Sequence, residues 1–177
     1  MLHPNPHCES SDQAKSAETE QETPRAVVVA KGKGKRYWGP GGDCYEFLVT
    51  GEESAGDSFT LLADVPVGGG PPLHLHEKES EAFYLLSGSL TFQIGTESIR
   101  ASQGDFVHIP RGVMHTYANT GDSRAMAIVV FSPAGMEGWF REVLVKAVDP
   151  AQGPYVYTEA QLQLMIAAGP RYGVSWG

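Results

Sequence analysis

Three histidines and one glutamate have the types and spacing of a metal site. His74 and His76 are separated by one residue within GGGPPLHLHEKESEAFYLLSG (68–88). On a β-strand this spacing places both imidazoles on the same face. Glu81 opens the next predicted strand, and His115 follows a later turn that could aim it at the same centre. Three imidazoles and one carboxylate suit one divalent transition ion, namely Fe, Mn, Co, Ni, Cu or Zn.

The residue types also indicate what kind of site this would be. Four protein ligands leave positions open on an ion that prefers five or six, as catalysis requires. A structural zinc site more often contains cysteines, and neither Cys8 nor Cys44 lies near these segments. Two alternatives remain: Glu79 competes with Glu81 for the carboxylate position, and strand histidines are more often core or surface residues than ligands. His108 lies outside the proposed site, and we expect it to be structural.

The elements that must position these side chains are predicted to be short strands. Apolar stretches separated by Gly, Pro, Asp and Ser recur along the chain, and many alternate as half-buried strands do. Eight or more short strands at close spacing predict an all-β sandwich or barrel. The candidate strands are 44–50, 58–65, 81–87, 90–94, 97–101, 105–110, 115–119 and 124–131.

Two helices are predicted after the last strand. Residues 134–146 carry large apolar side chains at helical spacing, which predicts an amphipathic helix packed on the barrel. A second helix begins at Thr158, whose spacing to Gln161 matches a capping box, and it ends at Gly169-Pro170. The chain thus divides into a disordered polar tail (1–24), a barrel (25–133) and a C-terminal helical extension (134–177).

Composition narrows the possible partners and location. The chain has 177 residues, which is enough for one domain with a sizeable core. Its formal net charge is −8. The acidic balance argues against nucleic acid and anionic membranes as partners. No apolar run of about 18 residues is present to span a membrane, and the first residues lack the blocks of a signal peptide. We therefore expect a cytoplasmic protein that binds a small molecule.

Two longer spacing patterns contain the four candidate ligands. They are Gly68-x5-His74-x-His76-x4-Glu81-x6-Gly88 and Gly104-x5-Pro110-x-Gly112-x2-His115-x3-Asn119. Throughout their length they resemble the first and second motifs of the cupin family. The resemblance implies a cupin double-stranded β-helix, or jelly-roll, barrel, and the predicted C-terminal helices would follow it. It also implies metal-ligand roles for His74, His76, Glu81 and His115, and a single pair of motifs implies a monocupin.

Other segments resemble one group within that family. PPLHLH, EAFYLLSG and PAGMEGWF look like the single-domain quercetinase-like cupins, whose enzymes open a flavonol ring with dioxygen and release carbon monoxide. The resemblance implies a metal-dependent dioxygenase for a flavonol-like or other aromatic or enol substrate. Glu81 would then be both a ligand and the catalytic proton acceptor. Burial in an apolar barrel would raise the pKa of Glu81, as suits a general base.

The surroundings of the site leave several alternatives open. By strand parity Phe83, Leu85 and Tyr117 point inward and Met114 lies at the mouth, so these residues form either the substrate pocket or ordinary core. The protein could instead be a non-oxidative cupin, such as an isomerase or decarboxylase, or a cupin that binds a small molecule without turnover. Cupin barrels commonly pair through edge strands, so the β-branched segment 26–30 predicts a homodimer.

Overall fold

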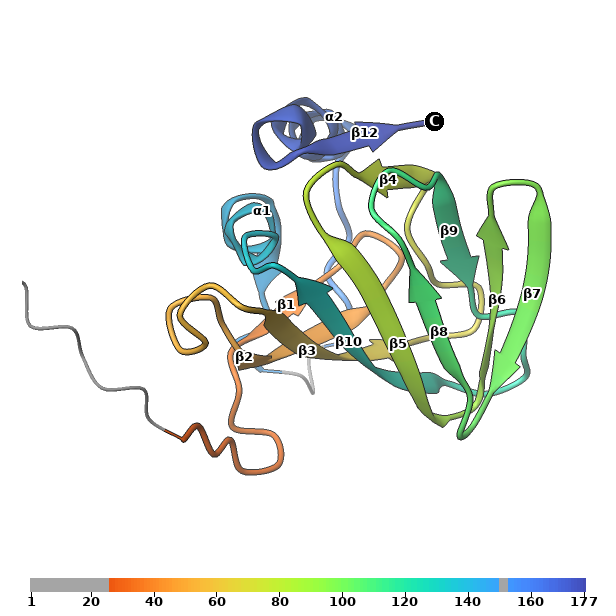
Figure 1. Cartoon of the computed structure of the whole chain (residues 1–177), viewed down its shortest axis with the longest axis horizontal. Coiled ribbons are helices and arrows are strands. Elements are labelled where there is room, and N and C mark those ends of the chain that lie inside the picture. Colours follow the sequence, from red (N-terminus) through yellow and green to blue (C-terminus); the bar gives the residue numbers. More distant parts are fainter. Residues whose placement is uncertain (1–25, 150–152) are drawn as a thin grey trace, which may run out of the picture.

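The structure, a computed structural model, describes residues 26–149 and 153–177 of the chain. The predicted tail at 1–24 lies outside the described residues. Two antiparallel sheets face each other and enclose a core, and short helices follow near the C-terminal end (Figure 1). The all-β jelly-roll prediction is confirmed.

The larger sheet has seven strands. It contains the predicted strands at 44–50, 58–65, 81–87, 105–110 and 124–131, and each begins or ends within a few residues of its expected bounds. In spatial order the strands are β11 (Val145–Lys146), β1 (Arg36–Trp38), β2 (Cys44–Val49), β3 (Phe59–Val65), β10 (Ala125–Ser132), β5 (Ser80–Ser87) and β8 (Phe106–Ile109).

The smaller sheet has five strands and contains two of the histidine-bearing segments. In spatial order its strands are β12 (Val174–Trp176), β4 (His74–His76), β9 (His115–Ala118), β6 (Ser89–Ile94) and β7 (Glu97–Ser102). β4 is therefore held between β9 and a strand that lies far along the chain.

Alternating apolar side chains explain why these segments form strands around a core. In β3, buried positions alternate strictly with half-buried ones, so one face of the strand meets the opposite sheet. Phe59 of β3 meets Phe47 edge-on and stacks on Phe131, with ring centroids 4.7 and 5.6 Å away. A second aromatic group joins the two sheets and contains Phe83, Phe92 and Tyr117.

The first C-terminal helix is shorter than the expected 134–146. α1 spans Glu137–Val143, and Leu144 after it has an extended backbone with φ −90° and ψ 147°. The chain then runs antiparallel to β1 as β11, where Val145 pairs with Trp38. The edge of β1 offers backbone hydrogen bonds that a longer helix would forgo, and β-branched residues favour this pairing. Met136, Trp139 and Phe140 still face the barrel, as predicted.

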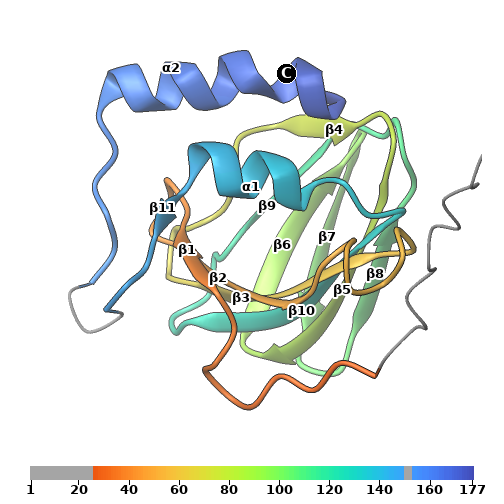
Figure 2. The ribbon, with the colours of Figure 1, turned by 90° about the vertical axis from the view of Figure 1, so that its left-hand side faces the viewer.

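The second helix lies where the sequence predicts it. α2 spans Glu159–Ala168, and a 3₁₀ turn over Gly169–Tyr172 leads into β12. In both views α2 lies beyond α1, at the end of the barrel where β4 lies (Figures 1 and 2). The described part of the predicted helical extension 134–177 thus contains two α-helices, a 3₁₀ turn and two strands, one in each sheet.

The start of α2 supplies a test of its capping box. The Thr158 hydroxyl accepts from the Gln161 backbone N–H, and the Gln161 side chain accepts from the Thr158 N–H. Thr158→Ala removes the hydroxyl, so we expect the free energy of unfolding to fall by about 1 kcal/mol in urea titrations. Gln163→Ala, at an exposed position of the same helix, should cost less than about 0.5 kcal/mol. Equal stability of the two variants would contradict the cap.

The expected strand at 26–30 is absent from the part of the chain that the structure describes. Residues 26–30 have no regular structure, and Val28 is 90% exposed. β-branched residues form a strand only beside a partner, and the outer edge of β1 is already taken by β11. The homodimer therefore stays a prediction, but segment 26–30 is not the edge strand through which it would form.

Among the described residues, no helix is long and apolar enough to cross a bilayer.

Candidate metal centre

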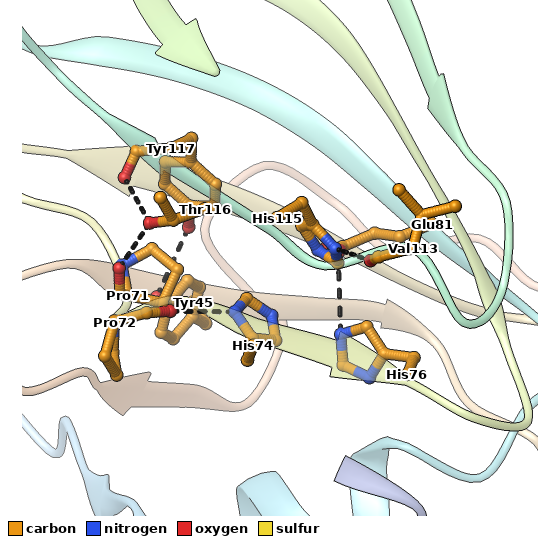
Figure 3. Close-up of polar contacts among 10 residues, drawn as sticks. All are labelled: Tyr45, Pro71, Pro72, His74, His76, Glu81, Val113, His115, Thr116 and Tyr117. Carbon is orange, nitrogen blue, oxygen red and sulfur yellow. Dashed lines mark hydrogen bonds and ion pairs between the residues drawn. The ribbon is translucent and has the colours of Figure 1, made fainter. Parts of the chain in front are cut away.

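The four predicted ligands come from three strands that meet near the end of the barrel that α2 covers (Figure 3). β4 carries His74 and His76, β5 carries Glu81, and β9 carries His115. His74 pairs with His115 across β4 and β9. Both histidines of β4 are buried and Leu75 between them is only half-buried, so the two-residue period of the strand turns both imidazoles inward.

These side chains form one compact buried cluster. One ligand atom from each residue lies within 4.8 Å of the others. His115 Nε2 lies 2.9 Å and His76 Nε2 3.5 Å from Oε2 of Glu81. The ring centroids of His74 and His115 are 4.4 Å apart. All four residues are at least nine-tenths buried, so the cluster is shielded from bulk water.

The hydrogen bonds around the cluster leave nitrogen lone pairs for an ion. Nδ1 of His74 lies 2.9 Å from the carbonyl oxygen of Pro72, and Nδ1 of His115 lies 2.9 Å from that of Val113. A carbonyl oxygen only accepts, so each Nδ1 carries a proton. The Nε2 of His74 then has its lone pair free, whereas the Nε2 of His115 faces the Glu81 carboxylate. Neither ring nitrogen of His76 has a hydrogen-bond partner within the described residues, although both are buried. A bound cation would satisfy this arrangement.

The pKa values of the cluster also suit a cation. Burial raises the pKa of Glu81, but the hydrogen bond from His115 and the nearby imidazole of His76 outweigh it and lower that pKa to about 2. Burial lowers the pKa of His74 to about 4. At neutral pH Glu81 is therefore a carboxylate and His74 is neutral, which are the ligating forms. For His115, burial lowers the pKa, but the hydrogen bond to Glu81 outweighs it and raises that pKa, so a bound cation would have to displace a proton there. The expectation of a raised pKa for Glu81 was wrong, because it counted burial and omitted the imidazole donors.

Two residues considered in the sequence lie outside the cluster. Glu79 is buried, and burial raises the pKa of its carboxyl group. It does not belong to the group of four whose ligand atoms converge. His108 is exposed on β8, away from the barrel interior. The carboxylate that the structure brings to the histidines is that of Glu81.

A cavity of about 390 Å³ opens beside the cluster and is lined by His74, His76 and Glu81. This volume lies within the range of small-molecule sites, about 300–1,000 Å³. Most of the wall is apolar, and part of it comes from Trp139 of α1 and Trp176 of β12. Trp176 also lies against the metal cluster, with its ring centroid 5.8 Å from that of His74.

The cavity differs in part from the predicted pocket. Of the four pocket residues expected from strand parity, Tyr117 lines the cavity, while Phe83, Leu85 and Met114 are not among its described lining residues. Phe83 and Leu85 do point inward, but they are fully buried in the core. Met114 precedes the inward-facing His115 on the chain, so it has the opposite parity.

Sequence reasoning missed most of the residues that wall the cavity. They belong to α1, α2, β12 and β2, and include Tyr45, Trp139, Phe140, Met165 and Trp176. The helical spacing in 134–146 did predict a face packed on the barrel. Nothing local in the sequence placed that face next to the histidines.

A buried carboxyl group lies behind Tyr45. Asp43 is fully buried, and its Oδ2 accepts from the Tyr45 hydroxyl at 3.2 Å. Its Oδ1 has no hydrogen-bond partner in the described part of the chain. Burial raises the pKa of Asp43 from 3.8 to about 6, although the Tyr45 hydroxyl opposes this shift. At neutral pH the group is thus ionised at a cost to stability.

Asp43→Asn is expected to stabilise the metal-free protein at neutral pH. The pKa of Asp43 in the folded state lies above its unfolded value of 3.8, so stability falls as the pH rises through this interval. Asn carries no charge and removes the penalty, which amounts to about 1–3 kcal/mol at pH 7. The gain should vanish near pH 4. Urea unfolding of both proteins at the two pH values measures it.

Asp64→Asn is the matched control for that prediction. Asp64 lies on β3, and its side chain is 38% exposed and paired with Arg124. Removing this surface pair should cost less than about 1 kcal/mol. A loss of stability in Asp43→Asn at pH 7 would contradict the prediction, since it would mean that the carboxylate is stabilising.

The fold and the site together define a class: a jelly-roll barrel with a candidate divalent-metal site in its interior. Residues 61–131 match the family model of the cupin domain. These residues form a cupin domain, and the chain resembles the quercetinase-like members of the cupin superfamily.

The chain is similar in sequence to two quercetin 2,3-dioxygenases. The chain is 28% identical over 134 residues to a quercetin 2,3-dioxygenase of Bacillus subtilis (strain 168), covering 76% of this chain and 38% of that protein. It is 35% identical over 120 residues to the quercetin 2,3-dioxygenase of Aspergillus japonicus, covering 63% and 34%. The chain thus spans less than two fifths of the length of these relatives.

Solved structures support the fold alone. KdgF from Halomonas sp. aligns with a TM-score of 0.55 at 18% identity, over 64% of this chain and 99% of that one. A predicted oxalate decarboxylase from Thermotoga maritima aligns with a TM-score of 0.55 at 23% identity, over 61% and 99%.

Proposed function

We propose that this protein is a metal-dependent dioxygenase that acts on a flavonol-like or other flat aromatic substrate with an enolic hydroxyl. The observation that carries the proposal is the position of the buried cluster at the wall of an apolar cavity. An apolar, aromatic wall favours a flat ring over a sugar, which would need several polar partners. The names of the two quercetin dioxygenases support the same substrate class.

The residues fit a divalent transition ion, which His74, His76, Glu81 and His115 would hold. When bound, such an ion supplies Lewis-acid and one-electron chemistry together with open coordination positions. In the proposed reaction the flavonol ring opens, both atoms of dioxygen enter the ester product, and one ring carbon leaves as carbon monoxide.

The chain's own side chains have two roles in this proposal. The Glu81 carboxylate is the proposed acceptor of the proton that the enolic hydroxyl of the substrate loses, because it is the carboxylate among the described residues that line the cavity. Trp139, Phe140 and Trp176 hold the flat ring and exclude water from the reacting carbon atoms. The cavity thus orients an electron-rich ring beside the metal cluster.

Oxygen uptake tests the proposal. Protein stripped with a chelator is reloaded with Fe, Mn, Co, Ni, Cu or Zn in turn and offered a panel of flavonols, while oxygen and carbon monoxide are measured. We expect uptake that requires both one particular metal and a flavonol, with one carbon monoxide released per oxygen consumed. Stoichiometric metal binding without uptake in any combination would overturn the proposal and favour a non-oxidative cupin or a binding protein.

A further inference from the structure

The cavity contains a second group of polar atoms besides the metal cluster. Tyr45 of β2 and Tyr117 of β9 carry the side-chain hydroxyls among its described lining residues. The two strands belong to opposite sheets, and the hydroxyl oxygens lie 3.5 Å apart (Figure 3). Both tyrosines are more than nine-tenths buried. Two hydroxyls thus face each other within an apolar wall.

The hydrogen bonds of this pair are not fully formed. Oxygen-to-oxygen hydrogen bonds usually span about 2.5–3.0 Å, and shorter values apply to a carboxylate acceptor. The tyrosine pair at 3.5 Å and the Tyr45–Asp43 contact at 3.2 Å are both longer. An oxygen atom of a ligand in the cavity could therefore complete the hydrogen bonding of these hydroxyls.

Asp43 determines which protons the pair can offer. An ionised carboxylate only accepts, so the Tyr45 proton points to Asp43. The Tyr45 oxygen is then left only to accept, and the single hydroxyl proton of Tyr117 is directed either to that oxygen, at 3.5 Å, or to a ligand in the cavity. The unpaired Oδ1 of Asp43 makes this arrangement costly, and a buried polar group that is not fully satisfied calls for an explanation beyond packing.

We propose that Tyr45 and Tyr117 form a second binding subsite that hydrogen-bonds an additional oxygen of the substrate, and that Asp43 is the positioning residue that orients Tyr45. The favoured substrate is then a polyoxygenated aromatic compound, with its enolic oxygen at the metal cluster and a further hydroxyl or carbonyl oxygen at the tyrosine pair. This subsite deepens the proposed function, because it rests on the same cavity being the substrate site.

Binding to zinc-loaded protein tests the subsite without turnover, because zinc has no redox chemistry. The probes are 3-hydroxyflavone and its derivatives with one added hydroxyl at the 7 or 4′ position. Quenching of tryptophan fluorescence reports binding, since Trp139 and Trp176 line the cavity. We expect at least one derivative to bind about tenfold more tightly than 3-hydroxyflavone.

Conservative variants then assign the preference to the subsite. Tyr45→Phe and Tyr117→Phe keep the rings and should remove most of the preference, while the affinity for 3-hydroxyflavone stays within about twofold of wild type. Tyr37→Phe is the matched control, because Tyr37 is buried and stacked on Phe47 but is not among the described residues that line the cavity. Zinc content is measured in every variant to show that the cluster is intact.

Asp43→Asn separates positioning from a structural role. We expect the preference for the hydroxylated ligand to fall severalfold while the melting temperature does not decrease. A lower melting temperature with an unchanged preference would overturn the role of Asp43. Unchanged preferences in Tyr45→Phe and Tyr117→Phe would overturn the subsite.

The outcomes also separate the subsite from the proposed function. Selective binding that depends on the tyrosines, without oxygen uptake in any metal form, would retain the subsite and refute the dioxygenase. Absence of binding by every flavone would overturn both.

Discussion

Glu81→Gln is expected to reduce metal-dependent oxygen uptake at least about 100-fold and to weaken metal retention. Gln has the size of Glu but no charge, so it provides neither an anionic ligand nor a proton acceptor. Its amide nitrogen or oxygen would also face the two imidazole nitrogens that now lie 2.9 and 3.5 Å from Oε2. Metal content after dialysis and oxygen consumption with a flavonol measure the two effects.

Glu79→Gln is the control for this result. Glu79 is buried two positions before Glu81 on the same segment, but it lies outside the converging group. We expect metal content close to that of wild type. Uptake and metal content that are unchanged in Glu81→Gln would refute the assigned role of Glu81, and equal losses in both variants would show a general effect of the segment.

Gly70→Ala is expected to destabilise the protein by about 3 kcal/mol or more, because backbone strain and overpacking each cost about 1–3 kcal/mol. Gly70 has φ +145°, a conformation that side chains rarely adopt, and an added Cβ would lie 2.0 Å from the carbonyl oxygen of Tyr117. That oxygen belongs to the backbone of β9, so it cannot rotate away. Urea unfolding measures the loss.

Gly68→Ala provides the comparison within the same loop. Gly68 also has a positive φ, +79°, but no described atom lies within 4 Å of the added Cβ. Only the backbone strain remains, so we expect a loss of about 1–2 kcal/mol. Similar losses at both positions would mean that the contact with Tyr117 relaxes. The difference between the variants isolates the close approach of the 68–72 loop to β9.

The histidine pair of β4 could be predicted from the sequence because its geometry follows from a local rule, whereas the assignment of Glu81 and His115 as ligands rested on the resemblance to the cupin motifs. One residue between His74 and His76 places both on one face of a strand, whatever the rest of the barrel does. The start of α2 was equally predictable, since Thr158 and Gln161 cap the helix within one turn. These features depend on neighbours a few positions away.

The wall of the cavity depends on distant contacts and was not predicted. Strand parity correctly predicted that Phe83 points inward, but parity does not predict whether an inward side chain lines the cavity or is buried in the core. Trp176 reaches the histidines because β12 pairs with β4, a contact between segments with no shared local pattern. The expected direction of the Glu81 pKa shift was wrong for the same reason, because this pKa depends on two imidazoles from other strands.

The pairing of β4 with β12 determines when, during synthesis, β4 gains its second neighbouring strand. His74 and His76 lie on a three-residue strand whose register with β12 extends over its whole length, whereas a single residue pair joins it to β9. The Ser175 hydroxyl that donates to Glu77 comes from 98 positions later. During translation, β4 therefore remains without one of its neighbours until residues 174–176 have left the ribosome. β12 supplies none of the four candidate ligands, but Trp176 lines the cavity beside them, so the wall of the cavity is complete only after β12 has paired with β4.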